Sequence, residues 1–553
     1  MGNYYGETKI LVLDDEKLIR LAMSAKLRSA GYTPIAVGTV NEALAAYKAN
    51  KQTCRAIIAD IMIGEMDGFV FRDIIRGLDP MIPIFFMTAL DPEEGSGFLG
   101  RILADGNSYY LPKSVQPKVM LSRIKSIVAS RKVEQFIERQ ISEQQSSLSL
   151  ASKVQSSMLP LGSVMTKRGF YTTYWRPKDV VSGDLYEAMQ YGDGTYLYVL
   201  GDIQGHGTSA ALAMTAVQAF LKQFRRDNGV VSEGPSYIAN MLQGFFSRYM
   251  SGVTYMTALI CVHRPLKGTV EWLSCGAPDL MVIDPSDGSC KPINPENKGG
   301  IPIGMLPDTQ YSDDDVVTTH LSDTAVCVSF TDGIFDLARD KDNMETMPTS
   351  FFENAVRELV SEARTTGAMF AVPQKIISLC EESGYRNFSD DVSILMFGKR
   401  LFNEGVFDAA LPLNPEAIEN IALELGEWCA ANGWDSGLVD RVQLVLEETL
   451  MNVHDHGVDP QDRISSVVGL RLCRMRELAE LTIWDSGTPP PSLEVAAGDS
   501  ATAMELKNKE FSGRGRGRLI IRSLCNGVSR SRYQDLNETV YHIPVEFVPE
   551  VGE

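Results

Sequence analysis

The chain has 553 residues, of which 44% are hydrophobic and 22% charged, so it is too long for one core and typical of three or four globular domains. Its formal net charge of −19 argues against a nucleic-acid partner, which would need a basic surface. Nine cysteines without a C-x-x-C pair fit reduced thiols better than a disulfide framework. Without a signal-peptide pattern or a membrane-length apolar run, we expect a soluble cytoplasmic protein with no membrane partner.

Residues 1 to about 128 alternate strand-like and helix-like segments. The apolar runs 10–13, 56–59, 82–87 and 109–111 have the character of strands buried on both faces of a sheet, and 39–42 has the spacing of a helix capping box. This alternation predicts a doubly wound α/β domain, whose ligands lie at the carboxyl ends of the strands. Five polar residues follow the predicted strands: Asp14, Asp15, Asp60, Thr88 and Lys113.

These side chains suit phosphoryl transfer, because two carboxylates can hold Mg²⁺ while a third attacks phosphorus. The arrangement resembles the flavodoxin-like receiver domain of two-component response regulators. The resemblance implies that Asp14, Asp15 and Asp60 hold Mg²⁺. It implies that Asp60 accepts a phosphoryl group from a histidine kinase or phosphotransfer protein, while Thr88 and Lys113 contact the phosphoryl oxygens.

The surroundings of the lysine depart from the family pattern. Tyr110 stands at the position of the family's switch aromatic, but Pro112 precedes Lys113 and Ser114 follows it, whereas the family places Pro directly after the lysine. A receiver-like domain that serves only for docking is therefore the alternative interpretation.

Residues 118–158 contain neither Gly nor Pro, which permits one long helix and predicts a linker over 129–160. Apolar residues recur at spacings that drift between three and four, so two interpretations stay open. The linker is either the seam of a coiled-coil homodimer or a single amphipathic helix lying on its own domains. A continuous helix would suit the transmission of a signal from one domain to the next.

Four Asp residues of the central segment each lie at the edge of an apolar strand. Asp184 follows Gly183, Asp202 follows the run 196–200, Asp332 follows the run 326–330, and Asp390 precedes the run 392–397. A single Asp in a Gly-rich turn is equally well explained as a turn cap. Four carboxylates converging on one end of a β-sandwich would repel one another unless cations neutralise them, so the set predicts a metal site.

Residues 159–399 resemble the PPM family of metal-dependent Ser/Thr protein phosphatases, in its sporulation and stress-response branch, and 154–160 resembles that branch's Gln-x-x-Leu-Leu-Pro entry segment. The resemblance implies an αββα sandwich over 161–400 and attack on phosphorus by a water between two ions. Asp391 would support the ligands from behind, and His206 is interpreted as a turn residue. The implied ligands of two Mn²⁺ or Mg²⁺ ions are Asp184, Asp202, Asp332, Asp390 and the carbonyl of Ile203.

Residues 401–553 combine a Glu/Asn helix with two Gly-containing loops. Glu448 and Asn452 lie one turn apart on a predicted helix, and such a pair needs a metal or phosphate partner if buried. A strand at 481–484 precedes Asp485-Ser486-Gly487, and the Gly/Arg run 513–518 enters a helix, which favours an anion. Taken alone, the Gly/Arg run could equally be a disordered basic patch.

In this order the motifs resemble the GHKL ATPase fold, an α/β sandwich, and especially the anti-sigma-factor serine kinases. The resemblance implies that Asn452 ligates Mg²⁺ on ATP, Glu448 takes the proton of the substrate hydroxyl, and Asp485 recognises the adenine amino group. Arg516 and Arg518 stand where the family often has apolar residues, and 489–511 is the predicted lid. The other implied nucleotide contacts are Gly487, Gly515, Gly517 and Thr539.

The sequence thus predicts a multidomain α/β and α+β chain: a response regulator that controls a phosphoserine/threonine phosphatase and an opposing serine kinase. The shared substrate implied by both resemblances is a STAS-type anti-sigma-factor antagonist, with a sigma factor as a further partner. One alternative makes the last domain an ATP-binding module that only sequesters a sigma factor or antagonist. Another makes all three domains docking scaffolds.

Overall fold

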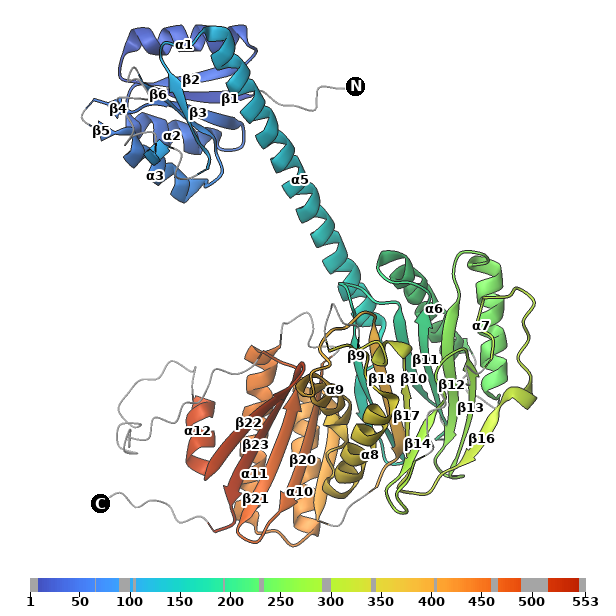
Figure 1. The fold of residues 1–553 in the computed structure, drawn as a ribbon. Helices are drawn as coiled ribbons and strands as arrows, with labels where there is room; N and C mark the ends of the chain where they lie inside the picture. Colours follow the sequence, from blue (N-terminus) through green and yellow to red (C-terminus); the bar gives the residue numbers. More distant parts are fainter. Residues whose placement is uncertain are drawn as a thin grey trace, which may run out of the picture. The chain divides into compact units, whose positions relative to one another are not determined.

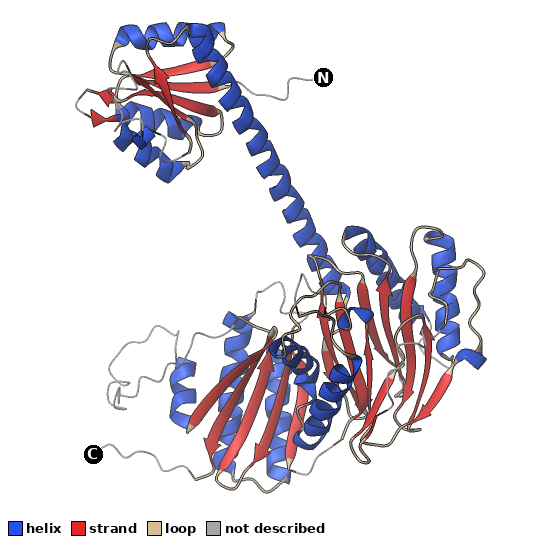
Figure 2. Ribbon diagram, viewed as in Figure 1, coloured by secondary structure: helices blue, strands red, loops and turns tan. Residues whose placement is uncertain are grey.

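The computed structural model of the chain describes residues 8–64, 66–88, 100–102, 106–191, 194–227, 233–290, 300–339, 345–401, 405–458, 466–488 and 516–546. The chain divides into two compact units, Met1–Ser147 and Leu148–Glu553. Figure 2 shows that both units combine sheets with covering helices. Among the described residues, no helix has both the length and the apolar character needed to cross a bilayer.

The first unit contains a parallel five-stranded sheet in the order β2-β1-β3-β6-β7. This is the flavodoxin-like strand order once the small β4–β5 pair (Met62–Ile63 and Met66–Asp67) is set aside. Helix α1 and the start of α5 pack against one face, and α2 and α3 against the other (Figure 1). The bounds are β1 Lys9–Leu13, α1 Lys17–Ser29, β2 Thr33–Val37, α2 Val40–Asn50, β3 Cys54–Asp60, α3 Gly68–Leu78, β6 Ile84–Thr88 and β7 Ser108–Pro112.

Two details of this unit differ from the sequence-based expectation. Strand β2 was not expected, because it is an edge strand without a fully buried residue and so lacks a continuous apolar run. At the start of α2, Thr39 caps the backbone N–H of Glu42 as the capping box predicts. The carboxylate of Glu42 accepts from the N–H of Gly38, however, and not from that of Thr39.

Two antiparallel sheets form the first part of the second unit, and their strand orders are β10-β11-β12-β13-β16 and β15-β14-β17-β18-β9-β8. Aromatic and aliphatic side chains fill the space between the sheets, while α6 and α7 cover one outer face and α8 and α9 the other. This is the expected αββα sandwich. The strands are β8 Ser163–Met165, β9 Gly169–Arg176, β10 Asp184–Gln190, β11 Tyr196–Ile203, β12 Met256–Arg264, β13 Thr269–Cys275, β14 Met281–Asp284, β15 Ser289–Cys290, β16 Val317–His320, β17 Val326–Phe330 and β18 Val392–Lys399. The helices are α6 Thr208–Asp227, α7 Pro235–Tyr249, α8 Thr349–Thr366 and α9 Val372–Glu382, with short turns η1 Asp313–Asp315, η2 Asp332–Ile334 and η3 Met369–Ala371.

The second unit continues with a five-stranded antiparallel-paired sheet in the order β19-β20-β21-β23-β22. Helices α10, α11 and α12 cover one face of this sheet, and Asn414 and Asp435 cap the first two of them with their side chains. The opposite face meets the αββα sandwich in a small shared core around Phe370 and Trp484. The bounds are β19 Val406–Pro412, α10 Pro415–Ala431, α11 Ser436–Asn452, η4 Val453–Gly457, β20 Val467–Arg474, β21 Leu478–Asp485, α12 Arg516–Leu524, β22 Gly527–Tyr533 and β23 Leu536–Pro544.

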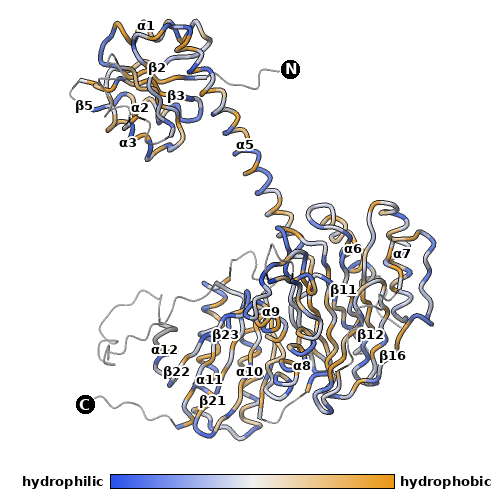
Figure 3. The backbone as a smooth tube through the Cα atoms, viewed as in Figure 1, coloured by the Kyte–Doolittle hydropathy of each residue, from blue (hydrophilic) through white to orange (hydrophobic). Residues whose placement is uncertain are grey.

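Helix α5, Pro117–Met158, is a single helix of 42 residues, as the absence of Gly and Pro from most of its length predicts. Hydrophobic and hydrophilic positions alternate along it (Figure 3). Its middle exposes several large apolar side chains, including Phe136, which is 62% exposed. The other exposed apolar residues of this stretch are Val133, Ile137 and Ile141.

Candidate functional site

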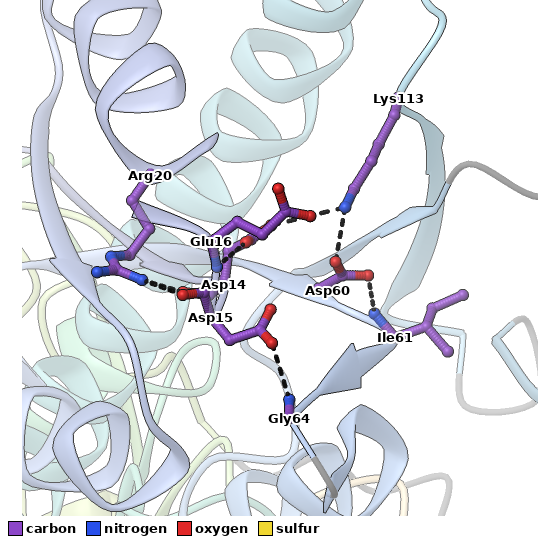
Figure 4. A network of polar contacts seen from close by, with 8 residues as sticks. All are labelled: Asp14, Asp15, Glu16, Arg20, Asp60, Ile61, Gly64 and Lys113. Atoms are coloured by element: carbon purple, nitrogen blue, oxygen red, sulfur yellow. Dashed lines mark hydrogen bonds and ion pairs between the residues drawn. The ribbon is translucent and has the colours of Figure 1, made fainter. Parts of the chain in front are cut away.

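Three carboxylates meet at the carboxyl ends of β1 and β3 in the first unit. One oxygen from each of Asp14, Asp15 and Asp60 can be chosen so that all three lie within 4.8 Å of one another. Nζ of Lys113, at the end of β7, lies 2.6 Å from Oδ2 of Asp60 and 3.7 Å from Oδ2 of Asp14 (Figure 4). Four of the five predicted receiver residues therefore form one cluster.

Backbone groups orient these carboxylates. Asp14 Oδ1 accepts from Glu16 N–H at 2.8 Å, and Asp60 Oδ1 accepts from Ile61 N–H at 2.7 Å. The sequence analysis missed Arg20, whose Nη1 donates to the carbonyls of Asp14 and Asp15 at 2.7 and 2.9 Å and ties helix α1 to the loop (Figure 4). Its position one helical turn into α1 was the available signal.

The electrostatics of this cluster fit a divalent cation. Burial raises the pKa of Asp14, and Oδ2 of its fully buried carboxylate accepts no hydrogen bond from the described residues. Burial lowers the pKa of Lys113, but the hydrogen bond and charge of Asp60 more than offset this, so the pKa is raised on balance. Thr88, the fifth predicted residue, is 6% exposed, and its carbonyl accepts from Lys113 N–H at 2.8 Å.

Asp184 and Asp202 are direct cross-strand partners at one end of the αββα sandwich. Oδ2 of Asp184 accepts from the hydroxyls of Thr331 and Ser393 at 2.9 and 2.6 Å, whereas its Oδ1 has no hydrogen-bond partner among the described residues although it is buried. A buried carboxylate oxygen without a donor is costly, and a cation would satisfy it. Asp202 is the penultimate residue of β11, so the strand runs slightly farther than the sequence predicts.

Asp332 and Asp390 reach the same end from the other sheet. The turn that carries Asp332 passes so close to residues 390–391 that a Cβ on Gly333 would lie 2.0 Å from the carbonyl oxygen of Asp391, which only glycine avoids. Asp391 is 3% exposed and accepts from the N–H groups of Lys178 and Gly183 at 2.7 Å each. It therefore braces the loop before Asp184, consistent with the expected supporting role.

These carboxylates lie close enough for their charges to act on one another, although among the described residues no three of them come together as tightly as Asp14, Asp15 and Asp60 do. Burial, followed by the charges of Asp184, Asp332 and Asp390, raises the pKa of Asp202 to about 9. The pKa of Asp332 is raised by burial and then by Asp390. No Lys or Arg in the described part of the chain forms an ion pair with any of the four, so the donor set fits divalent ions better than an internal salt bridge.

The carbonyl of Ile203 lies at the same strand end, where a Cβ on Gly183 would come within 3.0 Å of its oxygen. Gly205 and Gly207 follow with φ of 90° and 77°, a conformation that other residues rarely adopt. His206 between them is exposed, and its Nδ1 lies 3.5 Å from Asp179 Oδ2. This exposed position at the turn agrees with its interpretation as a turn residue.

Gln155, near the end of α5, makes a contact that the sequence analysis did not predict. Its side-chain amide donates to the carbonyl of Ser182 at 2.6 Å and accepts from the N–H of Ser182 at 3.0 Å, and the residue is 1% exposed. Ser182 is two residues before Asp184 and caps its N–H at 3.0 Å. The last turns of α5 thus hold the loop that carries a candidate metal ligand.

The last domain places Asp485 at the end of β21. Asp485 is 6% exposed, and its Oδ1 accepts from Gly487 N–H and from Asn537 Nδ2, each at 2.9 Å. Burial raises its pKa in spite of these donors. Thr539 is 5% exposed on the neighbouring strand, in register with Ile483 two residues before Asp485. Asn537 is a member of this site that the sequence analysis missed.

Glu448 and Asn452 lie one turn apart at the end of α11, and Asn452 Nδ2 donates to the carbonyl of Glu448 at 2.5 Å. Gly487 approaches the carbonyl of Gly457 so closely that a Cβ would lie 2.8 Å from it. Gly517 belongs to the first turn of α12. Gly515 and the predicted lid 489–511 lie outside the described residues.

Family models match three parts of the chain. They are the response regulator receiver domain over residues 10–125, stage II sporulation protein E (SpoIIE) over 192–400, and the histidine kinase-like ATPase domain over 411–541. The SpoIIE match begins after Asp184, so this predicted ligand lies outside the matched range. These families generally use divalent metal ions and, for the ATPase, ATP.

Similar proteins cover parts of the chain. The alkaline phosphatase synthesis transcriptional regulatory protein PhoP of Bacillus subtilis is 34% identical over 120 residues, 22% of this chain and 48% of that protein. The chain thus spans about half the length of the curated relatives it matches. The RsbU and RsbW domains of Rv1364c from Mycobacterium tuberculosis are 16% identical, covering 71% of this chain and 99% of that one, with a TM-score of 0.37. The SiaA-PP2C domain of Pseudomonas aeruginosa is 22% identical and covers 46% and 97%, also with a TM-score of 0.37.

The order of the three matched models agrees with the parallel sheet, the αββα sandwich and the final α/β sandwich described above. The chain therefore carries, in this order, a response regulator receiver domain, a SpoIIE-type PPM phosphatase domain and a histidine-kinase-like (GHKL) ATPase domain.

Proposed function

We propose that phosphorylation of Asp60 controls two opposed enzymes in this chain, a metal-dependent phosphoserine/threonine phosphatase and an ATP-dependent serine kinase. The domain boundaries that we assign are 1–128, 129–160, 161–400 and 401–553. The observation that carries the phosphatase is the buried Oδ1 of Asp184, which has no hydrogen-bond donor among the described residues and lies where burial and neighbouring carboxylate charges raise the pKa of both Asp184 and Asp202.

In the phosphatase, Asp184, Asp202, Asp332, Asp390 and the carbonyl of Ile203 would hold two Mn²⁺ or Mg²⁺ ions. When bound, such ions supply Lewis acidity at the phosphoryl oxygens and lower the pKa of the attacking water. The hydroxyls of Thr331 and Ser393 hold Oδ2 of Asp184, so Oδ1 is the oxygen left to bind an ion. The P–O bond to the serine or threonine oxygen breaks as the bond from the water oxygen forms, and no side chain acts as the nucleophile.

In the last domain, Asn452 would hold Mg²⁺ on ATP. Glu448 would take the proton of a serine hydroxyl as its oxygen bonds to the γ-phosphorus, while the bond from that phosphorus to the β–γ bridging oxygen breaks and ADP leaves. Their placement one turn apart on α11, which packs on the sheet that carries the buried Asp485, supports these roles. Asp485 has the buried carboxylate needed to accept from an adenine amino group, and Gly487, Gly515, Gly517 and Thr539 would contact the nucleotide.

The proposed shared substrate is a STAS-domain antagonist of an anti-sigma factor, whose phosphorylation state would set the availability of a sigma factor. This proposal rests on the pairing of a SpoIIE-type phosphatase with a histidine-kinase-like ATPase in one chain. A histidine kinase or phosphotransfer protein would phosphorylate Asp60, and the cluster of Lys113 with Asp14 and Asp60 supports such chemistry.

The linker helix α5 would pair with a second copy of the chain. Its exposed apolar residues Val133, Phe136, Ile137 and Ile141, between 48% and 62% exposed, support this dimer better than the alternative of a helix lying on its own domains. Light scattering on the wild type and on a Phe136→Lys, Ile137→Lys double variant tests this. A monomeric wild type would contradict it.

Purified protein mixed with a candidate STAS-domain antagonist tests the two activities separately. We expect ATP-dependent phosphorylation of the antagonist that is lost in Asn452→Ala, and Mn²⁺-dependent removal of that phosphate that is lost in Asp202→Ala. If the antagonist binds but is never phosphorylated, the last domain is the sequestering module instead. If neither variant differs from the wild type, the proposal of two enzymes is wrong.

A further inference from the structure

The β22–β23 hairpin belongs to the ATPase sheet, but its tip contacts the phosphatase domain. Oε1 of Gln534, in the turn of the hairpin, accepts from Tyr174 Oη at 3.4 Å and from Arg176 Nη1 at 3.3 Å. Gln534 has a φ of 57°, the left-handed conformation that a tight two-residue turn requires. Both phosphatase residues lie on β9, which pairs with β18 in the second sheet of the sandwich.

Glu538 of β23 makes a second contact between the hairpin and the phosphatase domain. Oε2 of Glu538 accepts from the indole Nε1 of Trp484 at 2.7 Å and forms an ion pair with Lys375 of α9 at 3.0 Å. Nζ of Lys375 also lies 4.8 Å from the centre of the Tyr533 ring, a cation–π distance. Trp484 stacks on Phe370 of the phosphatase domain, with ring centres 6.1 Å apart. The hairpin is therefore fastened to the phosphatase by polar and apolar contacts.

Strands β21 and β23, which carry Trp484 and Glu538, also carry candidate nucleotide residues on their opposite face. Successive side chains of a strand point to opposite faces of the sheet. Asp485 therefore points away from the face that carries Trp484, and Asn537 away from the face that carries Glu538. Asn537 donates to Asp485 Oδ1 and to the carbonyl of Gly487, each at 2.9 Å, and accepts from Arg532 in the hairpin. Because both sets of side chains belong to the same strands, a shift of β21 or β23 caused by nucleotide also shifts the side chains that contact the phosphatase domain.

On the phosphatase side the contact leads to the candidate metal site. Arg176 is the register partner of Val392, which directly follows Asp390 and Asp391. Two residues after Arg176, the N–H of Lys178 donates to Asp391 Oδ1 at 2.7 Å. Gln534 thus contacts the strand end from which the loop over the carboxylates departs.

We propose that the β22–β23 hairpin couples the two enzymes, so that adenine nucleotide bound at Asp485 changes the activity of the phosphatase metal site through Gln534 and Glu538. The inference rests on the proposed functions of both domains. Thermodynamic linkage makes any coupling between the two binding events reciprocal: nucleotide changes the affinity for the metal ions by the same factor as the metal ions change the affinity for nucleotide.

The test measures Mn²⁺-dependent hydrolysis of p-nitrophenyl phosphate by the full chain while ADP, which cannot donate a γ-phosphate, is titrated at constant free Mn²⁺. We expect the rate to change about fivefold, with a half-maximal effect at the ADP Kd measured by calorimetry. GDP is the matched nucleotide, because it chelates Mn²⁺ equally but lacks the adenine amino group. It should have no effect at the same concentration.

Gln534→Ala and Lys375→Met should lose the ADP response, although their nucleotide-free rate and ADP Kd stay within about twofold of the wild type. Ser531→Ala is the control on the same hairpin, since Ser531 is exposed, and it should respond like the wild type. A wild-type rate unchanged at saturating ADP, or variants that respond fully, would overturn the coupling and leave both proposed activities intact.

Failure of the proposed phosphatase is distinguishable, because it would appear as no hydrolysis even without nucleotide. The coupling is then measured as a difference between the ADP Kd of the wild type and that of Asp184→Asn, both in Mn²⁺, and equal values would overturn it.

Discussion

The receiver domain and the phosphatase domain each gather carboxylates at the end of a sheet, but they neutralise them differently. In the receiver, Lys113 lies 2.6 Å from Asp60 and 3.7 Å from Asp14, so an internal cation already balances part of the charge. In the phosphatase, Asp184 is held by two hydroxyls, and the described Lys and Arg side chains form no ion pair with Asp184, Asp202, Asp332 or Asp390.

In our proposal, this difference separates a phosphorylation switch from a catalytic metal centre. A nearby lysine favours the ionised form of a carboxylate, and an ionised carboxylate can act as a nucleophile toward phosphorus. Carboxylates whose pKa is raised, as it is for Asp184, Asp202 and Asp332, hold protons until divalent ions replace those protons. We therefore expect the phosphatase site to depend on metal ions far more strongly than the receiver site does.

The largest effect should follow from loss of the phosphatase ligands. Asp184→Asn keeps the side-chain shape but removes the negative charge, so we expect Mn²⁺-dependent hydrolysis of p-nitrophenyl phosphate to fall about 1000-fold. Addition of EDTA to the wild type should do the same. Asp323→Asn is the control, because Asp323 is an exposed carboxylate of the same domain that pairs with Lys399. Activity retained in Asp184→Asn at saturating Mn²⁺ would remove Asp184 from the ligand set.

The internal cation of the receiver gives the second prediction. Lys113→Ala removes the ammonium beside Asp60, so phosphorylation of Asp60 by a small acyl phosphate should slow about 100-fold, measured on gels that separate the phosphorylated form. Lys118, which is exposed at the start of α5, supplies the control substitution Lys118→Ala. Unchanged labelling of Lys113→Ala would favour a receiver in which the lysine does not contact the phosphoryl group.

The third prediction concerns the contact between α5 and the phosphatase loop. Gln155→Ala leaves the buried N–H and C=O of Ser182 without partners, which should cost about 2 kcal/mol of unfolding free energy. Because Ser182 positions Asp184, hydrolysis should also fall about tenfold. Ser157→Ala is the matched control, since its hydroxyl only bonds the carbonyl of Val154 in its own helix. Equal activity of both variants would show that α5 does not position the site.

The smallest effect is on stability as a function of pH. The pKa of Asp202 is raised from 3.8 to about 9, chiefly by burial and then by Asp184, and that of Asp184 is raised too. Between about pH 4 and 9, the metal-free native state therefore binds more protons than the unfolded state, and its unfolding free energy falls as pH rises. In EDTA, the Tm should be lower by a few degrees at pH 8.5 than at pH 5.5.

Two further measurements sharpen this pH prediction. Mn²⁺ should restore the Tm at pH 8.5, because bound ions replace the protons. Asp202→Asn should lessen the fall in Tm, since its side chain does not ionise in either state. A fall of the same size in Asp202→Asn would assign the pH dependence to other groups.

The sequence by itself was sufficient for the fold class and the order of the parts. Continuous apolar runs predict buried parallel strands, such as those over 56–59 and 82–87. A segment almost without Gly or Pro predicts the single helix α5. Acidic residues at strand ends pointed to Asp60 and Asp202, because topology gathers strand ends at one edge. The edge strand β2 was not predicted, because a half-exposed strand lacks a continuous apolar run.

Only the tertiary structure decided which distant groups support the site. Gln155, Asn537 and the hydroxyls of Thr331 and Ser393 act through contacts to backbone or carboxylate atoms far away in the chain, and no local pattern marks such partners. The fastening of the ATPase hairpin to β9 is equally invisible, because Gln534 and Tyr174 are ordinary residues 360 positions apart. Periodicity follows from local geometry, whereas these contacts arise only when separate elements pack together.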